Sequence, residues 1–444
     1  MNDILKTDLY QITMMAAQFY KKIDNKVITC EAFARKLPVE RKFFVMSGTE
    51  EIRNFLLNLS FGDDDIKQLK EIGVLKHIFS SSNFETYLKD FRFTGDFWAM
   101  AEGEIVFPGE PLVRITAPIS QANMVETFIL SVLNHDIKIA SKAARIVLAS
   151  KGKDVLEFGT RRTHHEAAIS CSRAAYLAGF TATSNVYASI KYGIPVAGTM
   201  SHMWVMSQES EEIAFKLFKD VYSNPVLLID TYDTLKGAEV ASKVPFVSGV
   251  RLDSGDFNTL SRQVRNILDS NGCNKVKIIV SGDLDEYKIH SLSDGVIDVF
   301  AVGTEVVSSS DVSSLGIVYK AVYDNEKNKP IIKMASGKQS LPGVKQVYLD
   351  ELSNELLHLV ALEDSIIDNI YLTPLLDCHI KDGNLQEENV VDLNVSRKYC
   401  NAGLLNLKPN LSSLSVEQIK VPIKIHESLE RLLSEALNDR LAMG

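Results

Sequence analysis

The chain of 444 residues is long enough for two or three domains, each with a hydrophobic core of its own. Hydrophobic residues make up 45% of it and charged residues 24%, which is ordinary for a soluble globular protein. The formal net charge of −9 weighs against nucleic acid or a membrane surface as the main partner, but it leaves room for a local basic pocket that binds a small anion.

Five cysteines are scattered along the chain without a CxxC pair, a set that fits a reducing cytoplasm better than a disulfide scaffold or a zinc module. The first residues, MNDILKTDLYQ, lack the basic and apolar regions of a signal peptide. No apolar stretch approaches the length of a transmembrane helix. We therefore expect a soluble, cytoplasmic protein.

The first third of the chain mixes helical and extended patterns. Residues 7–22 predict a helix that Thr7 can cap, with Asp8 suited to the positive end of the helix dipole. A strand is expected over 27–37, and a β-hairpin over 97–118 with its turn at a Pro-Gly pair. Helical patterns cover 49–59, 63–72, 83–91 and, as one long helix, 121–150.

From residue 154 onward, short apolar strands alternate with helical segments, which is typical of a parallel sheet covered by helices. The expected strands cover 154–159, 194–199, 225–230, 247–253, 276–282 and 298–304, with a weaker one at 182–188. The expected helices between them include 166–178, 208–221 and 257–270. Six or seven such units favour an α/β barrel, complete or incomplete, with an open doubly wound sheet as the alternative.

Cations and glycines follow several of these strands, at the edge where parallel α/β folds bind ligands. Arg161, Arg162 and Arg251 are not capping residues, and their guanidinium groups match phosphate oxygens. The late turns at Gly282 and at Gly303-Thr304 stand where barrels often bind phosphate through backbone N–H groups. The pattern predicts a site for a phosphorylated sugar that carries a further anionic group.

Carboxylates stand at the same strand ends. Asp230, Asp253 and Asp256, among those cations, suit ribose hydroxyls or a hard cation such as Mg²⁺. A single acidic residue at a strand end is more often a helix cap, and we expect capping for Asp283 and Glu305. The prediction of a site therefore depends on the whole set of strand ends.

The histidines differ in what their positions indicate. His202 follows an expected strand and has no second histidine or cysteine at metal-ligand spacing, so its place at a strand end favours a functional role. The adjacent pair His164-His165 point in different directions on a helix or strand, so we expect a capping or solvated role. His135, inside the long helix, is expected to be packed against its neighbours.

Nine motifs, in chain order from about residue 5 to about residue 350, resemble the nicotinate phosphoribosyltransferase family. They are KTDLYQITM, EFGTRRTHHEAA, TATSNV, GIPVAGTMSHMWVM, LIDTYDT, GVRLDSGDF, VSGDLDE, FAVGTEV and GKQSLPGVKQVY. The resemblance implies an α/β N-terminal domain over residues 1–120 and an incomplete α/β barrel over 121–325. It also implies that residues 326–444 hold a β segment, with two glycine turns in 329–350, that returns to the N-terminal domain, and a C-terminal extension.

The resemblance further implies a homodimer with active sites at the subunit interface. Each site would join nicotinate to phosphoribosyl pyrophosphate, with Mg²⁺, giving nicotinate mononucleotide and pyrophosphate. ATP would be a co-substrate, hydrolysed through a transient phosphohistidine at His202. An imidazole that is neutral near pH 7 is a competent phosphoryl acceptor.

By the same resemblance, Tyr10 of the other subunit and Phe158 sandwich the pyridine ring. Arg161 and Arg251 face the nicotinate carboxylate or the pyrophosphate. Asp230 and Asp253 would bind the ribose and the metal-bound pyrophosphate, and Gly282, Gly303 and Thr304 the 5′-phosphate. Ser184 would face the nicotinate carboxylate, and Thr199 is a further substrate-binding residue.

Ser184 favours the acid over the amide, because nicotinamide phosphoribosyltransferase carries an acidic residue there that would repel a carboxylate. The sequence SNVYAS and Met203 depart from the family pattern and could change the ring pocket. Alternatives are a nicotinamide-using or quinolinate-using enzyme, or a non-catalytic barrel that binds a phosphosugar. An aldolase is disfavoured because no expected strand ends in a lysine.

Overall fold

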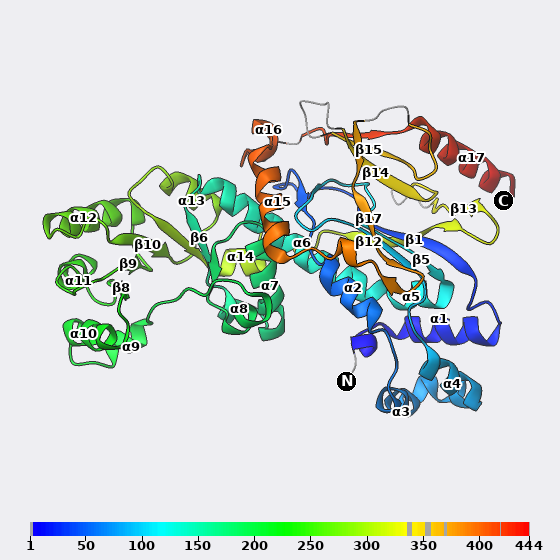
Figure 1. Ribbon diagram of the computed structural model, residues 1–444, viewed down its shortest axis with the longest axis horizontal. Coiled ribbons are helices and arrows are strands. Elements are labelled where there is room, and N and C mark those ends of the chain that lie inside the picture. The colour runs from blue at the N-terminus through cyan, green and yellow to red at the C-terminus, as the bar shows by residue number, and fades with distance from the viewer. Residues whose placement is uncertain (1–2, 335–339, 351–356, 368–370, 418, 444) are drawn as a thin grey trace.

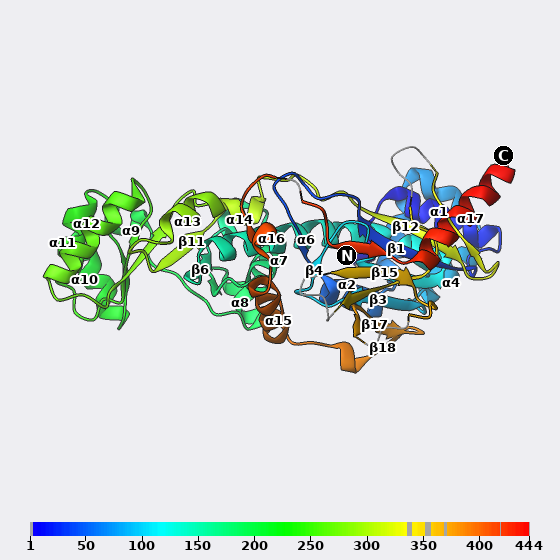
Figure 2. The same cartoon turned by 90° about the horizontal axis from the view of Figure 1, so that it is seen from above.

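The computed structural model describes residues 3–334, 340–350, 357–367, 371–417 and 419–443. The molecule is elongated, with a helix-covered parallel sheet at one end and a mixed β assembly at the other (Figure 1). Helix α6 (Glu126–Ala149) joins the two parts, because it contacts α2 (Thr49–Leu57) on one side and α13 (Glu286–Leu292) on the other (Figure 2).

The larger part is built on a seven-stranded sheet that draws strands from both ends of the chain. Its order is β13 (Lys329–Pro330), β12 (Ile317–Asp324), β1 (Val27–Ala34), β5 (Val113–Pro118), β3 (Asp96–Met100), β17 (Leu376–Lys381) and β18 (Asn384–Leu385). β1 is buried along most of its length because it pairs antiparallel with both β12 and β5. The expected hairpin is confirmed only in part: β3 pairs antiparallel with β5, but β4 (Ile105–Val106) lies between them and pairs with β2 (Phe44–Val45), so the turn at Pro108-Gly109 does not join two paired strands.

Short elements surround this sheet. The helices are α1 (Leu9–Tyr20), α3 (Asp63–Glu71), α4 (Ser82–Asp90) and α5 (Ile119–Met124), with turns η1 (Asp3–Leu5) and η2 (Gly73–Phe79) and a two-stranded sheet of β2 (Phe44–Val45) and β4 (Ile105–Val106). The long helix expected over 121–150 is divided at Val125 into α5 and α6. Thr7 does not cap α1: the cap position is Asp8, whose carboxylate instead accepts a hydrogen bond from Thr127 Oγ1 at 3.0 Å.

The smaller part confirms the incomplete barrel. Its six strands all pair in parallel, in the order β7 (Ala182–Thr183), β6 (Asp154–Glu157), β11 (Val299–Val302), β10 (Lys277–Ser281), β9 (Gly249–Leu252) and β8 (Val226–Leu228). The edge strands β7 and β8 do not pair with each other, so the sheet stays open. The central strands β10 and β11 are buried along most or all of their length, which explains their apolar runs at 278–280 and 299–302.

Helices cover the outside of this sheet. They are α7 (His165–Leu177), α8 (Val186–Tyr192), α9 (His202–Met206), α10 (Glu211–Val221), α11 (Thr234–Ala241), α12 (Phe257–Ser270), α13 and α14 (Thr304–Ser308), with the turn η3 (Thr160–Arg162). The helices expected over 166–178, 208–221 and 257–270 are confirmed as α7, α10 and α12.

One expected strand of the barrel is wrong, and another is shorter than expected. Residues 194–199 form only an isolated bridge, between Val196 and Thr183, because Pro195 has no N–H for a strand ladder and Val196 is exposed. Within 182–188, the strand is limited to Ala182–Thr183, which pair with β6. Asn185 then accepts a hydrogen bond from Ala188 N at 2.9 Å and starts helix α8.

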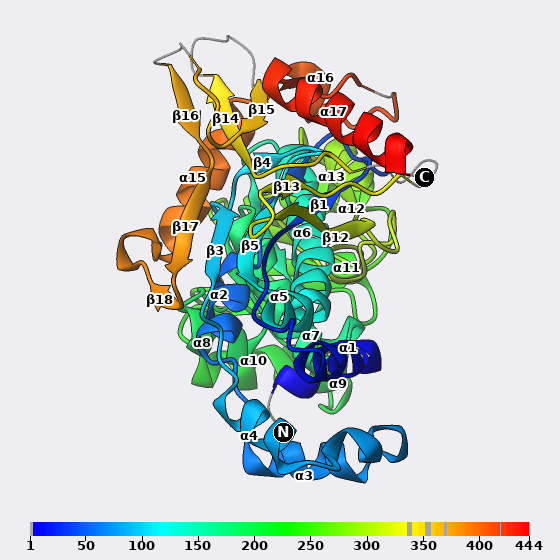
Figure 3. The same ribbon diagram turned by 90° about the vertical axis from the view of Figure 1, so that its right-hand side faces the viewer.

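The C-terminal sheet folds onto the larger part, whereas α15 (Leu393–Leu405) packs against α7 of the smaller part. A four-stranded sheet has the order β16 (Leu372–Pro374), β14 (Lys345–Asp350), β15 (His358–Leu362) and β19 (Ile423–Ile425), and it is followed by α17 (Glu427–Met443). The turn η4 (Glu387–Asn389) and helices α15 (Leu393–Leu405) and α16 (Pro409–Ser412) connect β18 to β19. α17 lies at the opposite end of this part from α3 and α4 (Figure 3).

The segment 329–350 contains β13 and β14, and Gly343 makes one expected turn with φ +85°. The other turn, at Gly337, lies outside the described residues. Strand β12 precedes residue 326 and already pairs with β1 of the larger part. Within the described ranges, no helix is both long enough and apolar enough to cross a membrane.

Candidate functional site

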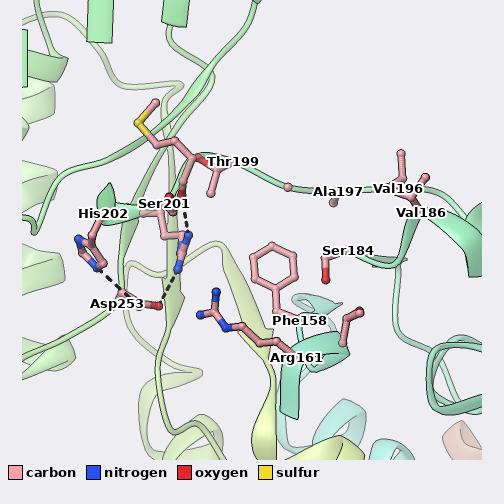
Figure 4. A pocket seen from close by; sticks show the side chains of 14 residues that line it. Phe158, Arg161, Ser184, Val186, Val196, Ala197, Thr199, Ser201, His202 and Asp253 are labelled. Atoms are coloured by element: carbon pink, nitrogen blue, oxygen red, sulfur yellow. Dashed lines mark hydrogen bonds and ion pairs between the residues drawn. The ribbon is translucent and has the colours of Figure 1, made fainter. Parts of the chain in front are cut away.

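A cavity of about 530 Å³ opens at the carboxyl ends of the parallel strands, the edge that the sequence predicted. Its lining residues come from the turns after β6, β7 and β9 and from the segment before α9 (Figure 4). They are Phe158, Thr160, Arg161, Ser184, Val186, Val196, Ala197, Gly198, Thr199, Met200, Ser201, His202, Arg251 and Asp253.

A second hollow of about 70 Å³ adjoins this cavity and shares Phe158, Arg161, Arg251 and Asp253 with it. It adds the late glycine turns, and its further lining residues are Arg162, Ser281, Gly282, Asp283, Ala301, Gly303 and Thr304. The structure therefore brings the predicted arginines, glycine turns and Asp253 together at one continuous site.

Phe158, Arg161 and Ser184 gather at one side of the cavity (Figure 4). Phe158 follows β6, and its N–H donates to Val302 O at 2.8 Å, which fixes its backbone to β11. Arg161 is exposed, and no described residue accepts a hydrogen bond or forms an ion pair with it. An aromatic face beside a free guanidinium group and a hydroxyl suits a flat ring that carries a carboxylate.

Arg251 is buried beneath the cavity floor, and its donors are engaged within the protein. Its Nε donates to Ser281 Oγ at 2.8 Å, Nη1 to Met200 O at 3.2 Å and Nη2 to Asp253 Oδ1 at 2.8 Å. Burial raises the pKa of Asp253, but the charge of Arg251 and the hydrogen bonds from Ser281 and Arg251 outweigh it, so the pKa lies below its ordinary value. Asp253 therefore stays ionised at neutral pH.

His202 is the first residue of α9 and lies at the other side of the cavity (Figure 4). Its Nδ1 is 3.0 Å from Thr231 Oγ1. Its Nε2 is 3.7 Å from Asp253 Oδ2 and 4.0 Å from Asp230 Oδ1. The side chain of His202 is 39% exposed, so the ring can be reached from solvent while two carboxylates flank it.

Asp230 does not line the cavity, since its side chain is only 1% exposed. Its Oδ2 accepts hydrogen bonds from Asp253 N at 2.9 Å and Ser254 Oγ at 2.6 Å. Its Oδ1 is buried without a hydrogen-bond partner among the described residues and faces the His202 ring. Asp230 thus holds the turn after β9 through Oδ2, and its Oδ1 is directed at the imidazole of His202.

The glycine turns are tightly packed against neighbouring strand ends. Gly282 has φ +100°, and a Cβ there would lie 2.2 Å from Asp253 O. A Cβ at Gly303 would lie 3.1 Å from Phe158 O. Thr304 begins α14 immediately beyond that turn. These close approaches let the backbones of β9, β10, β11 and β6 meet around the smaller hollow.

Two of the predicted substrate-binding residues, Tyr10 and Thr199, differ from the others in their surroundings. Tyr10, on α1, is 46% exposed and is not among the residues that line either hollow. Thr199 lines the cavity, but its hydroxyl donates to Val226 O at 2.5 Å and holds the loop against β8.

Some of the acidic and histidine residues at strand ends act as helix caps, and others do not. Asp256 accepts a hydrogen bond from Asn258 N at 3.2 Å and caps α12, so its assignment to ribose or a cation is not needed. The cap of α13 is Asp285, whereas Asp283 has φ +47° and Glu305 lies in the first turn of α14, so their expected capping roles are wrong. His164 caps α7, as expected.

His135 packs against Cys171, with 3.5 Å between Nε2 and Sγ.

Sequence reasoning missed two further residues: Thr231, the partner of His202, and Glu157, which lies beneath the Phe158 turn. Both stand at strand ends, but the sequence pattern does not show which way their side chains point. Across the described parts of the chain, no three His, Cys, Asp or Glu side chains gather into a metal site.

Comparisons with known proteins agree with the predicted family. The family model of the nicotinate phosphoribosyltransferase N-terminal domain matches residues 5–134, and that of the nicotinate phosphoribosyltransferase family matches residues 154–360. A nicotinate phosphoribosyltransferase of Mycobacterium tuberculosis is 37% identical over 439 residues, covering 96% of this chain and 92% of that protein. One of Bacillus subtilis is 40% identical over 361 residues, 78% of this chain and 72% of that protein.

Solved structures are similar over nearly the whole length. A nicotinate-nucleotide pyrophosphorylase of Pyrococcus furiosus has a TM-score of 0.75 at 27% identity, covering 91% of this chain and 97% of that one. Human nicotinic acid phosphoribosyltransferase has a TM-score of 0.82 at 22% identity, covering 97% and 99%, and shows the shared fold. The resemblance seen in the sequence motifs is confirmed, and the chain belongs to the nicotinate phosphoribosyltransferase family.

Proposed function

We propose that this enzyme transfers the phosphoribosyl group of phosphoribosyl pyrophosphate to nicotinate, releasing nicotinate mononucleotide and pyrophosphate, as a step of NAD biosynthesis. The observation that carries the proposal is the continuity of the two hollows through Phe158, Arg161, Arg251 and Asp253. One continuous site can hold a flat acidic ring and a phosphorylated sugar in contact with each other. The names of the relatives support the choice of nicotinate.

The pyridine ring binds against Phe158, with its carboxylate directed to Arg161 and the hydroxyl of Ser184. Support comes from the free guanidinium group of Arg161 and from the absence of an acidic side chain among the described residues that line this side. A serine hydroxyl can donate to a carboxylate, whereas an aspartate would repel it. This side of the cavity therefore favours nicotinate over nicotinamide.

The 5′-phosphate of the donor binds in the smaller hollow, at the backbone of Gly282, Gly303 and Thr304. Backbone N–H groups at such turns bind phosphate oxygens well, and Arg162 adds a cation at the rim. The ribose then extends into the larger cavity toward Asp253, with Arg251 holding the Asp253 carboxylate in place.

Asp253 fits a Mg²⁺ ion that is shared with substrate phosphates. Its Oδ1 is occupied by Arg251 and Ser281, while Oδ2 is directed into the site beside His202. Magnesium is commonly bound by one or two carboxylates together with phosphates and waters, so a protein cage is not required. When bound, the ion neutralises charge on the departing pyrophosphate.

In the transfer step, the lone pair of the pyridine nitrogen forms a bond to C1 of the ribose while the bond from C1 to the pyrophosphate oxygen breaks. The nitrogen has no proton to lose, so the protein needs no strong general base. Its contribution is to align the ring through Phe158 and Arg161, while Asp253, oriented by Arg251, would hold the ion that offsets the charge of the departing pyrophosphate.

His202 accepts the γ-phosphoryl group of ATP in a coupled reaction. A bond from nitrogen to phosphorus forms, the bond to the ADP oxygen breaks, and water later releases phosphate. With Nδ1 hydrogen-bonded to Thr231 Oγ1, Nε2 is the atom left to react. A phosphoryl group at Nε2 adds negative charge beside Asp253 and Asp230, which alters the binding of pyrophosphate.

The active enzyme is a homodimer in which Tyr10 of the partner subunit covers the ring opposite Phe158. Support comes from the large exposure of Tyr10 and of apolar side chains at the mouth of the cavity, Val186 at 64% and Val196 at 59%. Exposed apolar surface of this kind at a site favours a protein partner.

The test is pyrophosphate release by the purified protein with nicotinate, nicotinamide or quinolinate as the acceptor. We expect release that requires nicotinate and phosphoribosyl pyrophosphate together and increases with ATP. Release with nicotinamide but not with nicotinate would move the chain to the amide-using enzymes. No release with any acceptor would favour a phosphosugar-binding barrel.

A further inference from the structure

Glu157 is a buried carboxyl group that the proposed reaction does not use. It is the last residue of β6 and is 1% exposed. Its carboxyl oxygens accept hydrogen bonds from the Gly159 N–H, from Thr183 Oγ1 at 2.5 Å and from Ser172 Oγ at 2.9 Å. Burying a carboxyl group costs free energy of desolvation that an apolar side chain at this position would avoid. The hydrogen bonds that Glu157 makes therefore indicate what its carboxyl group does.

Two of these donors belong to the turns that carry the ring-binding residues, and the third, Ser172, lies on helix α7. Gly159 directly follows Phe158, and Thr183 directly precedes Ser184. The carbonyl of Glu157 also accepts a hydrogen bond from Ser184 N at 2.9 Å. One residue thus contacts both the turn that presents the aromatic ring and the turn that presents the hydroxyl.

The same contacts extend to the rest of the cavity wall. Thr183 Oγ1 accepts a hydrogen bond from Asn185 N at 3.0 Å. The backbone of Thr183 exchanges hydrogen bonds with Pro195 O and Ala197 N, at 3.0 and 2.9 Å, which holds the segment that carries Val196. On the other side, a Cβ at Gly159 would lie 2.9 Å from both Glu157 Oε1 and Gly303 O, so the turn has little freedom to move.

We propose that Glu157 is a positioning residue that fixes the spacing between Phe158 and Ser184, and so sets the affinity of the site for the pyridine substrate. The role rests on the proposed function, since it concerns nicotinate in that reaction. Glu157 does not line either hollow and acts through Gly159 and Thr183. Its carboxyl group accepts its hydrogen bonds from Gly159, Ser172 and Thr183, and not from the phosphate turns at Gly282 and Thr304.

Replacing Thr183 by valine removes one hydroxyl donor at constant size and leaves Glu157 in place. We expect Thr183→Val to raise the KM for nicotinate about tenfold, while kcat and the KM for phosphoribosyl pyrophosphate change less than about twofold. Thr183→Ser keeps the hydroxyl and should restore the KM. Glu157→Gln, whose amide is both donor and acceptor, should show the same selective rise.

Thr181→Val is the matched control, because Thr181 Oγ1 donates to Val155 O at 3.2 Å and makes no hydrogen bond with Glu157. Equal rises in both threonine variants, or a parallel loss in kcat and in both KM values at Thr183→Val, would indicate general damage and overturn the role. A wild-type KM for nicotinate in a folded Thr183→Val would also overturn it.

The two proposals fail in different ways. A wild-type protein that releases no pyrophosphate with nicotinate overturns the proposed function, and the Glu157 role falls with it. A wild-type protein that is active, together with variants whose KM for nicotinate is unchanged, overturns the role of Glu157 alone. Thermal melting of each variant identifies any that fail to fold, and Thr183→Ser keeps the comparison valid in that case.

Discussion

Arg251 donates a hydrogen bond from Nη2 to Asp253 Oδ1 at 2.8 Å, across the single residue that separates them in the chain. The same guanidinium group reaches Ser281 on β10 and the carbonyl of Met200 before α9. Because these contacts come from three sides of the site, Arg251 fixes the carboxylate that we assign to the metal-bound pyrophosphate. The single ammonium group of a lysine cannot make these three hydrogen bonds in the same geometry as the planar guanidinium group.

Arg251→Lys should therefore lower kcat about a hundredfold, because Asp253 loses its orientation. The pKa of Asp253 should also rise, so that the acid limb of the pH profile moves to higher pH. Steady-state rates across pH check both effects. Arg262→Lys, on the exposed face of α12, is the control. A wild-type kcat in Arg251→Lys would show that Arg251 does not orient Asp253 for the reaction.

Tyr10→Ala tests the shared active site by complementation. A dimer that joins a Tyr10→Ala chain to an Arg161→Ala chain has one intact site, because each chain supplies what the other lacks. Each variant alone should be nearly inactive, and an equal mixture after subunit exchange should regain about a quarter of the wild-type activity. Mixtures that stay inactive, although the subunits exchange, would contradict the shared site.

Gly282 should tolerate no side chain. Alanine there must adopt φ +100° and place its Cβ 2.2 Å from Asp253 O, so the β9 turn has to move. We expect Gly282→Ala to lower the free energy of unfolding by more than about 3 kcal/mol and to abolish turnover. Urea unfolding measures the first effect.

Gly109 provides the matched comparison for that variant. It also has a positive φ, of +91°, but a Cβ there meets no described atom within 4 Å. Gly109→Ala should therefore cost only the backbone strain, about 1 kcal/mol, and leave activity unchanged. Equal losses in the two variants would show that the close approach to Asp253 has no effect.

His358 should make stability depend on pH. Its Nδ1 lies 2.7 Å from Glu110 Oε1, in the contact between β15 and the turn before β5. Burial lowers the pKa of His358, but the charge and hydrogen bond of Glu110 outweigh it, so the folded-state pKa lies above 6.5. This stability is fully present below the unfolded-state pKa and is lost as the pH rises through the folded-state pKa.

The loss of unfolding free energy caused by His358→Asn should accordingly be larger at about pH 6 than at about pH 9. Urea unfolding of both proteins at the two pH values gives the difference. A loss that is the same at both pH values, or larger at the higher one, would show that the imidazole is not held in its charged form.

The sequence predicted the centre of the barrel better than its edges. β10 and β11 lie in the middle of the sheet and are mostly buried, so each contains an unbroken apolar run that is easily recognised. Residues 182–188 and 194–199 line the open edge and the cavity, where polar and exposed residues are tolerated. Apolar pattern alone cannot separate a strand from a loop there.

The site residues that could be predicted from the sequence are likewise those next to easily recognised strands. Arg161 and Gly303 could be predicted because each follows a recognisable strand, whereas the role of Phe158 came from the resemblance to the family. Thr231 was missed because its contact with His202 depends on how α9 is turned against β8, which no sequence pattern specifies. Glu157 was passed over because a carboxylate at a strand end does not reveal which side it faces.

The most direct measurement is mass detection of nicotinate mononucleotide formed by the wild-type protein and by His202→Ala, each with and without ATP. We predict that the wild-type protein forms the nucleotide, more with ATP than without, while His202→Ala forms a small amount that ATP does not increase. His290→Ala, on the exposed part of α13, should behave as the wild-type protein does. An ATP response that survives in His202→Ala would contradict the phosphohistidine, and no nucleotide from the wild-type protein would contradict the transfer itself.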